Sequence, residues 1–252
     1  MKRALFGKPG MIVALGAAAL AACSPAPREP VEGARQPATS GWTRPPAIDS
    51  VLRAGAGLVV GGAAEPGARV VLRSDSGAAY AATANGQGRF EIRMAAPSGH
   101  LLLRPETQVG QDAAPSPDRL LILAGGRGPI AVLRPGGATR RLDAAPALGA
   151  VDGDGAARLA SGRVQTAAVP VVVVAGGETV RVTPDSVGRW SLMLNPAAGA
   201  DEIRVGGQTF LWPGIDAPGS GLQVERAGQG WRVGWPGPSD ARQTSWLPDA
   251  GG

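Results

Sequence analysis

The chain has 252 residues, of which 39 are glycine and 23 are proline, and 44% are hydrophobic. The hydrophobic fraction excludes a chain that is disordered throughout, and the many turn-forming residues indicate short strands joined by turns. One cysteine and one histidine exclude a disulfide framework, a Cys-rich zinc or iron–sulfur site and a multi-histidine metal site. The net charge of +5 falls to +2 without residues 1–22, which hold three basic residues and no acid, so charge gives no reason to expect nucleic acid.

Residues 1–22 combine a basic head with a 12-residue apolar run over 11–22. This run is too short for a transmembrane helix, which needs about 20 apolar residues, and the pattern is that of an export signal. The run ends on Leu20-Ala21-Ala22-Cys23, which resembles the lipobox of bacterial lipoproteins. The alternative is an ordinary secretory signal with a chance cysteine.

The lipobox resemblance implies that Cys23 is the lipid attachment site. In that family a diacylglycerol is attached to the sulfur, the signal is cut before the cysteine, and the new amine is acylated, commonly with palmitate. Several acyl chains give stable anchoring where one does not. Position 24 is Ser and not Asp, which by the enteric sorting rule implies the outer membrane, with the protein facing the periplasm.

Residues 23–47 follow the signal and contain six prolines. They predict a disordered or polyproline-like tether, which at about 3.1 Å per residue would reach roughly 70 Å. Trp42 is its only large apolar residue. The sequence leaves open whether Trp42 docks on the folded part or is a loose anchor.

The remainder of the chain contains an internal repeat. Residues 85–92 (NGQGRFEI) match residues 185–192 (DSVGRWSL) at an offset of 100, and residues 126–132 fall near residues 228–233 at an offset of about 102. Two matching blocks at a nearly constant offset predict two tandem units, over 48–146 and 147–250.

Within each unit the residue pattern is that of strands. Phe90, Ile92 and Met94 alternate with charged residues, and the runs 69–72 and 171–174 are short and rich in β-branched residues. Turn signals separate them at 65–67, 75–77, 85–86 and 175–177. We therefore expect an all-β protein with two tandem β-sandwiches.

Residues 58–72 (LVVGGAAEPGARVVL) and 85–90 (NGQGRF) resemble the start of bacterial Ig-like domains. The second unit keeps the block at 185–190 but has residues 164–170 in place of the Pro-Gly hairpin. The resemblance implies Ig-like sandwiches, which act as spacers, adhesin stalks or interaction modules, and the fold alone does not give a function.

Several residues could support chemistry. His100 could be a general base, although no nucleophile motif accompanies it, and a histidine at the edge of a turn is favoured. Asp152 and Asp154 could offer oxygen ligands to calcium, although a polar turn between the units is favoured. Asp201 and Glu202 with Asp216 are the carboxylates that a hydrolase would need, but their spacing is no better than chance.

The last 41 residues hold four of the six tryptophans. Trp231, Val233 and Trp235 occupy every second position and so share one strand face, which predicts core positions. Trp246 is expected to be exposed, with Arg242 beside it for a cation–π or polar contact, and this pair is the candidate ligand contact. Exposed arginines such as Arg69, Arg73, Arg89 and Arg93 are expected to belong to a mixed, solvated surface.

These observations together favour a non-catalytic lipoprotein of the cell envelope that binds a protein partner through its Ig-like domains. The alternative is a module that binds carbohydrate or peptidoglycan through the C-terminal tryptophans. We expect no enzymatic activity, metal, cofactor or nucleic acid. The membrane is expected to be contacted through the lipid on Cys23.

Overall fold

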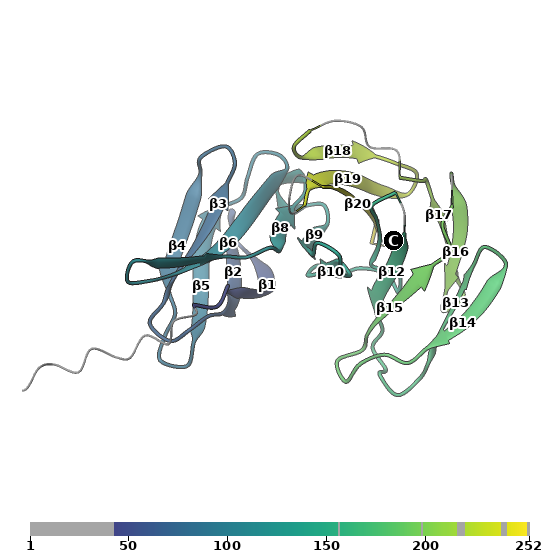
Figure 1. Ribbon diagram of the computed structural model, residues 1–252, viewed down its shortest axis with the longest axis horizontal. Helices are drawn as coiled ribbons and strands as arrows, with labels where there is room; N and C mark the ends of the chain where they lie inside the picture. The colour runs from purple at the N-terminus through teal and green to yellow at the C-terminus, as the bar shows by residue number, and fades with distance from the viewer. Residues whose placement is uncertain (1–42, 156, 198, 216–219, 238–240, 251–252) are drawn as a thin grey trace, which may run out of the picture. The chain divides into compact units, whose positions relative to one another are not determined.

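The computed structural model describes residues 43–155, 157–197, 199–215, 220–237 and 241–250. Over these residues the chain is all β, with antiparallel strands in four sheets, one short 3-10 turn at Ala124–Gly126 and no α-helix (Figure 1). The all-β prediction is thereby confirmed. Cys23, Trp42 and the segment predicted to be an export signal lie outside the described residues, within which no helix has the length and apolar character to cross a membrane.

Two sheets come from residues 47–141, and we call them the first sandwich. The smaller sheet has the order β1-β2-β5, with β1 at Ala47–Ala54, β2 at Gly57–Ala63 and β5 at Arg89–Ala95. The larger sheet has the order β10-β9-β8-β6-β3-β4, and β7 pairs with β6. Its strands are β3 (Arg69–Ser74), β4 (Ala79–Thr83), β6 (Leu101–Val109), β7 (Asp112–Pro115), β8 (Arg119–Ile122), β9 (Ile130–Leu133) and β10 (Arg140–Arg141).

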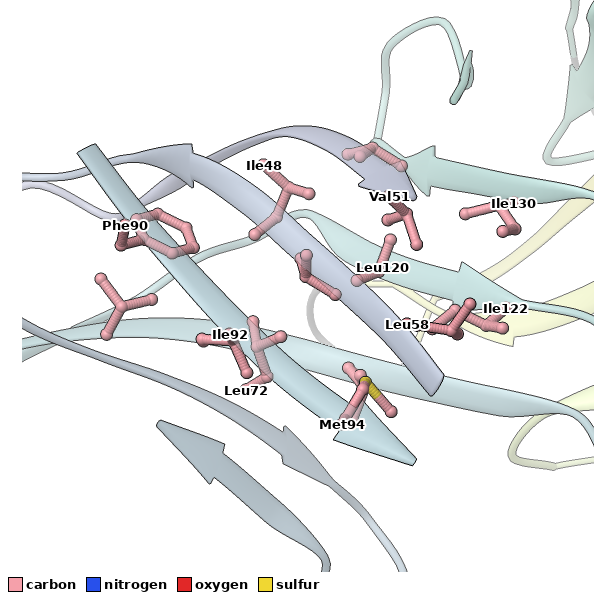
Figure 2. Close-up of a cluster of buried hydrophobic side chains, with 14 of the residues drawn as sticks. Ile48, Val51, Leu58, Leu72, Phe90, Ile92, Met94, Leu120, Ile122 and Ile130 are labelled. Carbon is pink, nitrogen blue, oxygen red and sulfur yellow. The ribbon is translucent and has the colours of Figure 1, made fainter. Parts of the chain in front are cut away.

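The core of the first sandwich lies between these two sheets (Figure 2). Strand β5 alternates as predicted, with Phe90, Ile92 and Met94 buried and the residues between them exposed. Leu72 of β3 and Ile122 of β8 approach from the larger sheet. Burying each such side chain contributes about 1.5–3 kcal/mol, so the alternation in the sequence determines which face of each strand turns inward.

The second sandwich is built from residues 150–248. Its larger sheet has the order β15-β12-β11-β20-β19-β18, and its smaller sheet has the order β14-β13-β16-β17. The strands of the larger sheet are β11 (Ala150–Gly153), β12 (Arg158–Arg163), β15 (Arg189–Leu194), β18 (Gln223–Arg226), β19 (Gly230–Pro236) and β20 (Arg242–Pro248). Those of the smaller sheet are β13 (Val171–Ala175), β14 (Glu178–Val182), β16 (Asp201–Val205) and β17 (Gln208–Trp212).

The repeat block 85–92 and 185–192 forms the same turn in both sandwiches. Oδ1 of Asn85 accepts hydrogen bonds from the amides two and four residues further on, at 3.0 and 2.9 Å. Oδ1 of Asp185 accepts the equivalent two bonds at 3.0 and 2.9 Å. Gly88 and Gly188 take the left-handed conformation that closes each turn, with φ of 72° and 80°. The similarity in sequence between the two blocks therefore reflects one shared local structure.

The later strands of the two sandwiches differ in their pairing. β6 has nine residues, and its free edge pairs with β7 over 106–109 and with β8 over 101–103. β16 has five residues, and β17 pairs with all of them. Because β17 occupies that edge, β18, β19 and β20 join the other sheet by pairing β20 with β11. The blocks at 126–132 and 228–233 are thus alike in sequence but not in topology.

Candidate functional site

The two sandwiches share an apolar junction. On β8 and β9 the side chains alternate, so that Leu120 and Ile122 enter the first core while Leu121 and Leu133 turn to the opposite face. That opposite face packs against the larger sheet of the second sandwich to form one buried cluster. Its members are Leu102, Leu121, Leu123, Ala131, Leu133, Ala150, Val233, Trp235 and Leu247. Both faces of β8 and β9 are therefore buried, which explains their continuous apolar sequences.

The predicted core character of the Trp231–Trp235 segment is confirmed at this junction. Val233 and Trp235 have 0% and 1% of their surface exposed, and Trp231 is partly buried against the same cluster. The core that they enter lies between the sandwiches and not inside the second one. Sequence alternation reveals that a face is buried but not which surface covers it.

A polar network sits beside this apolar cluster. Oδ1 of Asp152 accepts hydrogen bonds from Oγ1 of Thr139 at 2.6 Å and from Oγ of Ser245 at 2.6 Å. Oδ2 of Asp152 accepts a hydrogen bond from the backbone amide of Thr139 at 2.7 Å. Oγ of Ser161 donates to the carbonyl of Thr139 at 3.0 Å, and Nε1 of Trp235 donates to Oγ of Ser245 at 3.2 Å. Since Thr139 precedes β10, the network joins the two sandwiches.

The environment of Asp152 changes its acidity. Burial raises the pKa of the Asp152 carboxyl to about 6, and the hydrogen bonds from Ser245 and Thr139 oppose this rise. Burial outweighs the hydrogen bonds because, among the residues that the structure describes, no cation is paired with the carboxylate to stabilise its charge. Asp152 therefore takes up a proton at a higher pH than an ordinary aspartate.

The favoured interpretation of residues 152–155 as a turn between the units is wrong for Asp152. Asp152 lies in β11, and because Val151 enters the second core, the Asp152 side chain points to the junction. Asp154 is exposed in the β11–β12 connection and accepts the amide of Ala157 at 3.0 Å. Among the described residues, no group of three or more His, Cys, Asp or Glu side chains is placed to hold a metal ion.

A buried arginine makes a second connection between the sandwiches. Arg141 of β10 has 5% of its side chain exposed and bonds through Nε and Nη2 to the two carboxylate oxygens of Asp143 at 2.7 and 2.6 Å. Its Nη1 donates to the carbonyls of Gly149 at 3.1 Å and of Pro248 at 2.9 Å. Planar, bidentate geometry of this kind is the strong form of an ion pair.

The carboxylates proposed for a hydrolase do not form a pair. Oδ2 of Asp201 accepts a hydrogen bond from Nη1 of Arg158 at 3.0 Å. The guanidinium of Arg158 also lies 4.6 Å from the ring centroid of Trp212. Glu202 is the next residue of β16, so its side chain points to the other face, where it bonds Arg204 at 2.9 Å. Asp216 lies outside the described residues. Asp201 thus has a structural role as the partner of a buried cation.

The expectation that Trp246 is exposed is wrong. Trp246 is fully buried in the second core, and its Nε1 donates to the carbonyl of Ala227 at 3.0 Å. The reason is the strand order, because β20 lies between β11 and β19 in the middle of the sheet. Arg242 is partly buried at the start of β20, and its Nη1 donates to the carbonyl of Gly221 at 3.3 Å. Trp246 therefore has no free face on which a ligand could stack.

The other expected surface residues lie where the sequence placed them. His100 is exposed beside a bend, its Nδ1 accepts the amide of Ala124 at 3.2 Å, and its ring contacts Trp231 edge-on at 5.4 Å. The four arginines named for a mixed surface are exposed, and three of them form salt bridges with carboxylates. These are Arg73 with Glu106, Arg89 with Asp49 and Arg93 with Glu91.

Exposed large apolar side chains are concentrated in the second sandwich. Of the six in the described part of the chain, only Leu52 belongs to the first sandwich. The other five are Val169, Val172, Val187, Met193 and Leu211, with exposures of 38–59%. Met193 of β15 and Leu211 of β17 belong to different sheets, and the neighbours of each enter the second core, so these two side chains leave the sandwich on opposite outer faces.

Comparison of the chain with the models of known protein families and with curated proteins found no match. The functional conclusion therefore depends on the residues of the chain itself.

Proposed function

We propose that this chain is a lipid-anchored protein of the bacterial cell envelope, held in the outer membrane through Cys23 and facing the periplasm. Its body would be a non-catalytic accessory component, built from Ig-like sandwiches, that binds a protein partner. The observation that carries the proposal is the motif at residues 20–23 after a basic and apolar segment. In the lipoprotein family this combination directs lipid attachment to the cysteine.

A protein partner fits the exposed side chains better than a glycan does, because the exposed apolar groups are aliphatic and the tryptophans are mostly covered. Met193 and Leu211 are each 59% exposed on the second sandwich, whereas the tryptophans that motivated carbohydrate binding are mostly internal. Trp212, Trp235 and Trp246 are at most 2% exposed, and Trp231 is covered on one face by Arg226, whose guanidinium lies 4.8 Å from the ring. A sugar ring needs a free aromatic face, so the structure gives the glycan alternative no support from these four residues.

Membrane fractionation tests the anchor. The full chain and a Cys23→Ser variant are expressed in a Gram-negative host with a C-terminal tag, and membranes are separated from soluble extract. We expect the unaltered chain in the outer-membrane fraction with covalently bound fatty acid, and the variant in the soluble fraction without it. Fatty acid on the Cys23→Ser variant, or none on the unaltered chain, would overturn the proposed anchor.

Cross-linking in the membrane followed by tag purification tests the partner. We expect a stoichiometric protein that is lost with a Met193→Gln variant or with a Leu211→Gln variant, which alter opposite outer faces of the second sandwich. A Leu52→Gln variant, which alters the exposed apolar residue of the first sandwich, serves as the control and should retain that protein. Recovery of the chain alone, together with co-sedimentation of the chain with purified cell-wall sacculi, would contradict protein binding and favour the glycan alternative.

A further inference from the structure

The Asp152 carboxylate is the central acceptor of the junction between the sandwiches. It accepts two hydrogen bonds from Thr139, in the segment before β10, and one from Ser245 of β20. Ser245 is fully buried and Thr139 has 4% of its surface exposed. One carboxylate therefore joins a segment of the first sandwich to the middle of a sheet of the second.

Asp152 is half-buried, and within the described part of the chain the groups that donate hydrogen bonds to its carboxylate are neutral. The polar groups that face it or its direct partners are Thr139 before β10, Ser161 of β12, Trp235 of β19 and Ser245 of β20. The arginines of these elements bond other groups. From β10, Arg140 bonds Ile48 and Arg141 bonds Asp143, and from β12, Arg158 bonds Asp201 and Arg163 bonds Val187. In the β18–β19 hairpin Arg226 bonds Asp249 and Arg232 bonds Glu225, and Arg242 of β20 bonds Gly221. No charged group contributes to the shift in the pKa of Asp152.

We propose that Thr139, Asp152 and Ser245 form a proton-dependent latch, which holds the two sandwiches together more tightly when Asp152 is protonated. This device does not depend on the lipid anchor or on the proposed partner. It would let the protein change the coupling between its two halves in response to the pH around it.

The direction of the effect follows from linkage. With the junction closed, burial raises the pKa of Asp152 to about 6, and in an open junction the carboxyl would meet water and return to its ordinary value of 3.8. Because the closed form binds the proton more tightly, lowering the pH from about 7 to about 4 favours closure. Above this range the carboxyl is ionised in both forms, and below it the carboxyl is protonated in both. The difference between the two pKa values corresponds to about a 100-fold change in the ratio of closed to open protein.

The network can serve both protonation states. The hydroxyls of Thr139 and Ser245 lie 3.4 Å apart, and either can donate to the other. A hydroxyl both donates and accepts, and its hydrogen rotates to suit its neighbours. When a proton from solvent is added to Asp152, its carboxyl group can donate a hydrogen bond to Oγ1 of Thr139. The Thr139 hydroxyl can then rotate and donate its own hydrogen to Oγ of Ser245. The hydrogen bonds are therefore rearranged and not lost.

A buried thiol at the junction can measure how often the latch opens. Ala131 lies in the junction cluster and is fully buried, so a thiol in its place reacts only after the sandwiches separate. The test uses the full chain with Cys23→Ser and Ala131→Cys, a disulfide reagent that reacts with thiols across this pH range, and an unstructured thiol peptide to correct for intrinsic reactivity. A second chain carries Ala160→Cys instead, because Ala160 is fully buried inside the second core and reports unfolding of that sandwich.

We expect the corrected labelling rate at position 131 to fall by about 100-fold between pH 7.5 and pH 4. Position 160 should react more slowly than position 131 at pH 7.5, which would show that separation does not require unfolding. Asp152→Asn should abolish the pH dependence at position 131, whereas Asp112→Asn, at an exposed carboxylate of β7, should retain it. A rate that is constant or rises on acidification would overturn the proposal, as would a pH dependence that survives Asp152→Asn.

A second variant covers the case in which Asp152→Asn does not fold. The Ser245 hydrogen bond lowers the pKa of Asp152, so Ser245→Ala should move the pH at which labelling slows to a higher value. A carbon-13 NMR titration of the Asp152 carboxyl in the unaltered junction should give a midpoint near 6. An unmoved transition in Ser245→Ala, or a carboxyl midpoint near 4, would overturn the latch.

Discussion

Replacing Trp235 with alanine should uncouple the two sandwiches. Trp235 is 1% exposed and belongs to the junction cluster, not to either internal core. Truncating a buried tryptophan costs about 3–5 kcal/mol, and losing the bond from its Nε1 to Ser245 removes about 1 kcal/mol more. Because the lost contacts lie between the sandwiches, the cost should fall on their coupling, while the second core stays packed.

Two optical probes can distinguish the unfolding of the two sandwiches in a denaturant titration. Of the six tryptophans in the sequence, five lie between residues 190 and 246, so tryptophan fluorescence mainly follows the second sandwich. Far-ultraviolet circular dichroism follows strands in both. In the unaltered chain the two transitions should coincide, and in Trp235→Ala they should separate.

A matched variant controls for simple loss of a large side chain. Trp212 is also buried, at 2% exposure, but it lies in the second core. Trp212→Ala should lower the free energy of unfolding that fluorescence reports by a similar amount, about 3–5 kcal/mol. This loss should destabilise the second sandwich itself. The junction argument would be refuted if Trp235→Ala left both probes coincident and changed the free energy of unfolding by less than about 1 kcal/mol.

Three further substitutions test individual positions by equilibrium denaturation. Gly188→Ala should cost about 2–4 kcal/mol of stability, because φ is 80° and the new Cβ would lie 2.1 Å from a carbonyl oxygen. Gly176→Ala, with open space around it, should cost about 1 kcal/mol. Equal costs would contradict the close approach at Gly188. Thr107→Val should stabilise the protein by about 1 kcal/mol, since its buried hydroxyl has no hydrogen-bond partner within the described part of the chain. Destabilisation would mean that the hydroxyl is bonded. Arg158→Met should cost about 3 kcal/mol by leaving Asp201 without its cation, and adding Asp201→Asn should recover part of that loss unless the pair has no energetic role.

Local structure was predictable from the sequence because it depends on neighbouring residues. The alternation through Phe90 and Ile92 placed β5 and its inward face correctly. The matching blocks at Asn85 and Asp185 formed matching turns because each side chain bonds amides only two and four residues away.

Non-local pairing was not predictable in the same way. Trp246 is buried because β20 pairs with β11, which lies about 90 residues earlier, and no local pattern encodes that partner. In the sequence Asp152 belongs to a glycine-rich acidic segment, but its role depends on Thr139 and Ser245, which reach it from other elements. Val151 beside it gave the one available signal, since an inward valine sends the next side chain to the opposite face.

The measurement that tests the central proposal most directly is the intact mass of the protein purified from membranes, combined with analysis of its N-terminal peptide. The proposal predicts a mature chain that begins at Cys23, with a diacylglycerol on the sulfur and an acyl group on the amine. A chain that retains residues 1–22, or one that is cut elsewhere and carries no lipid, would contradict it.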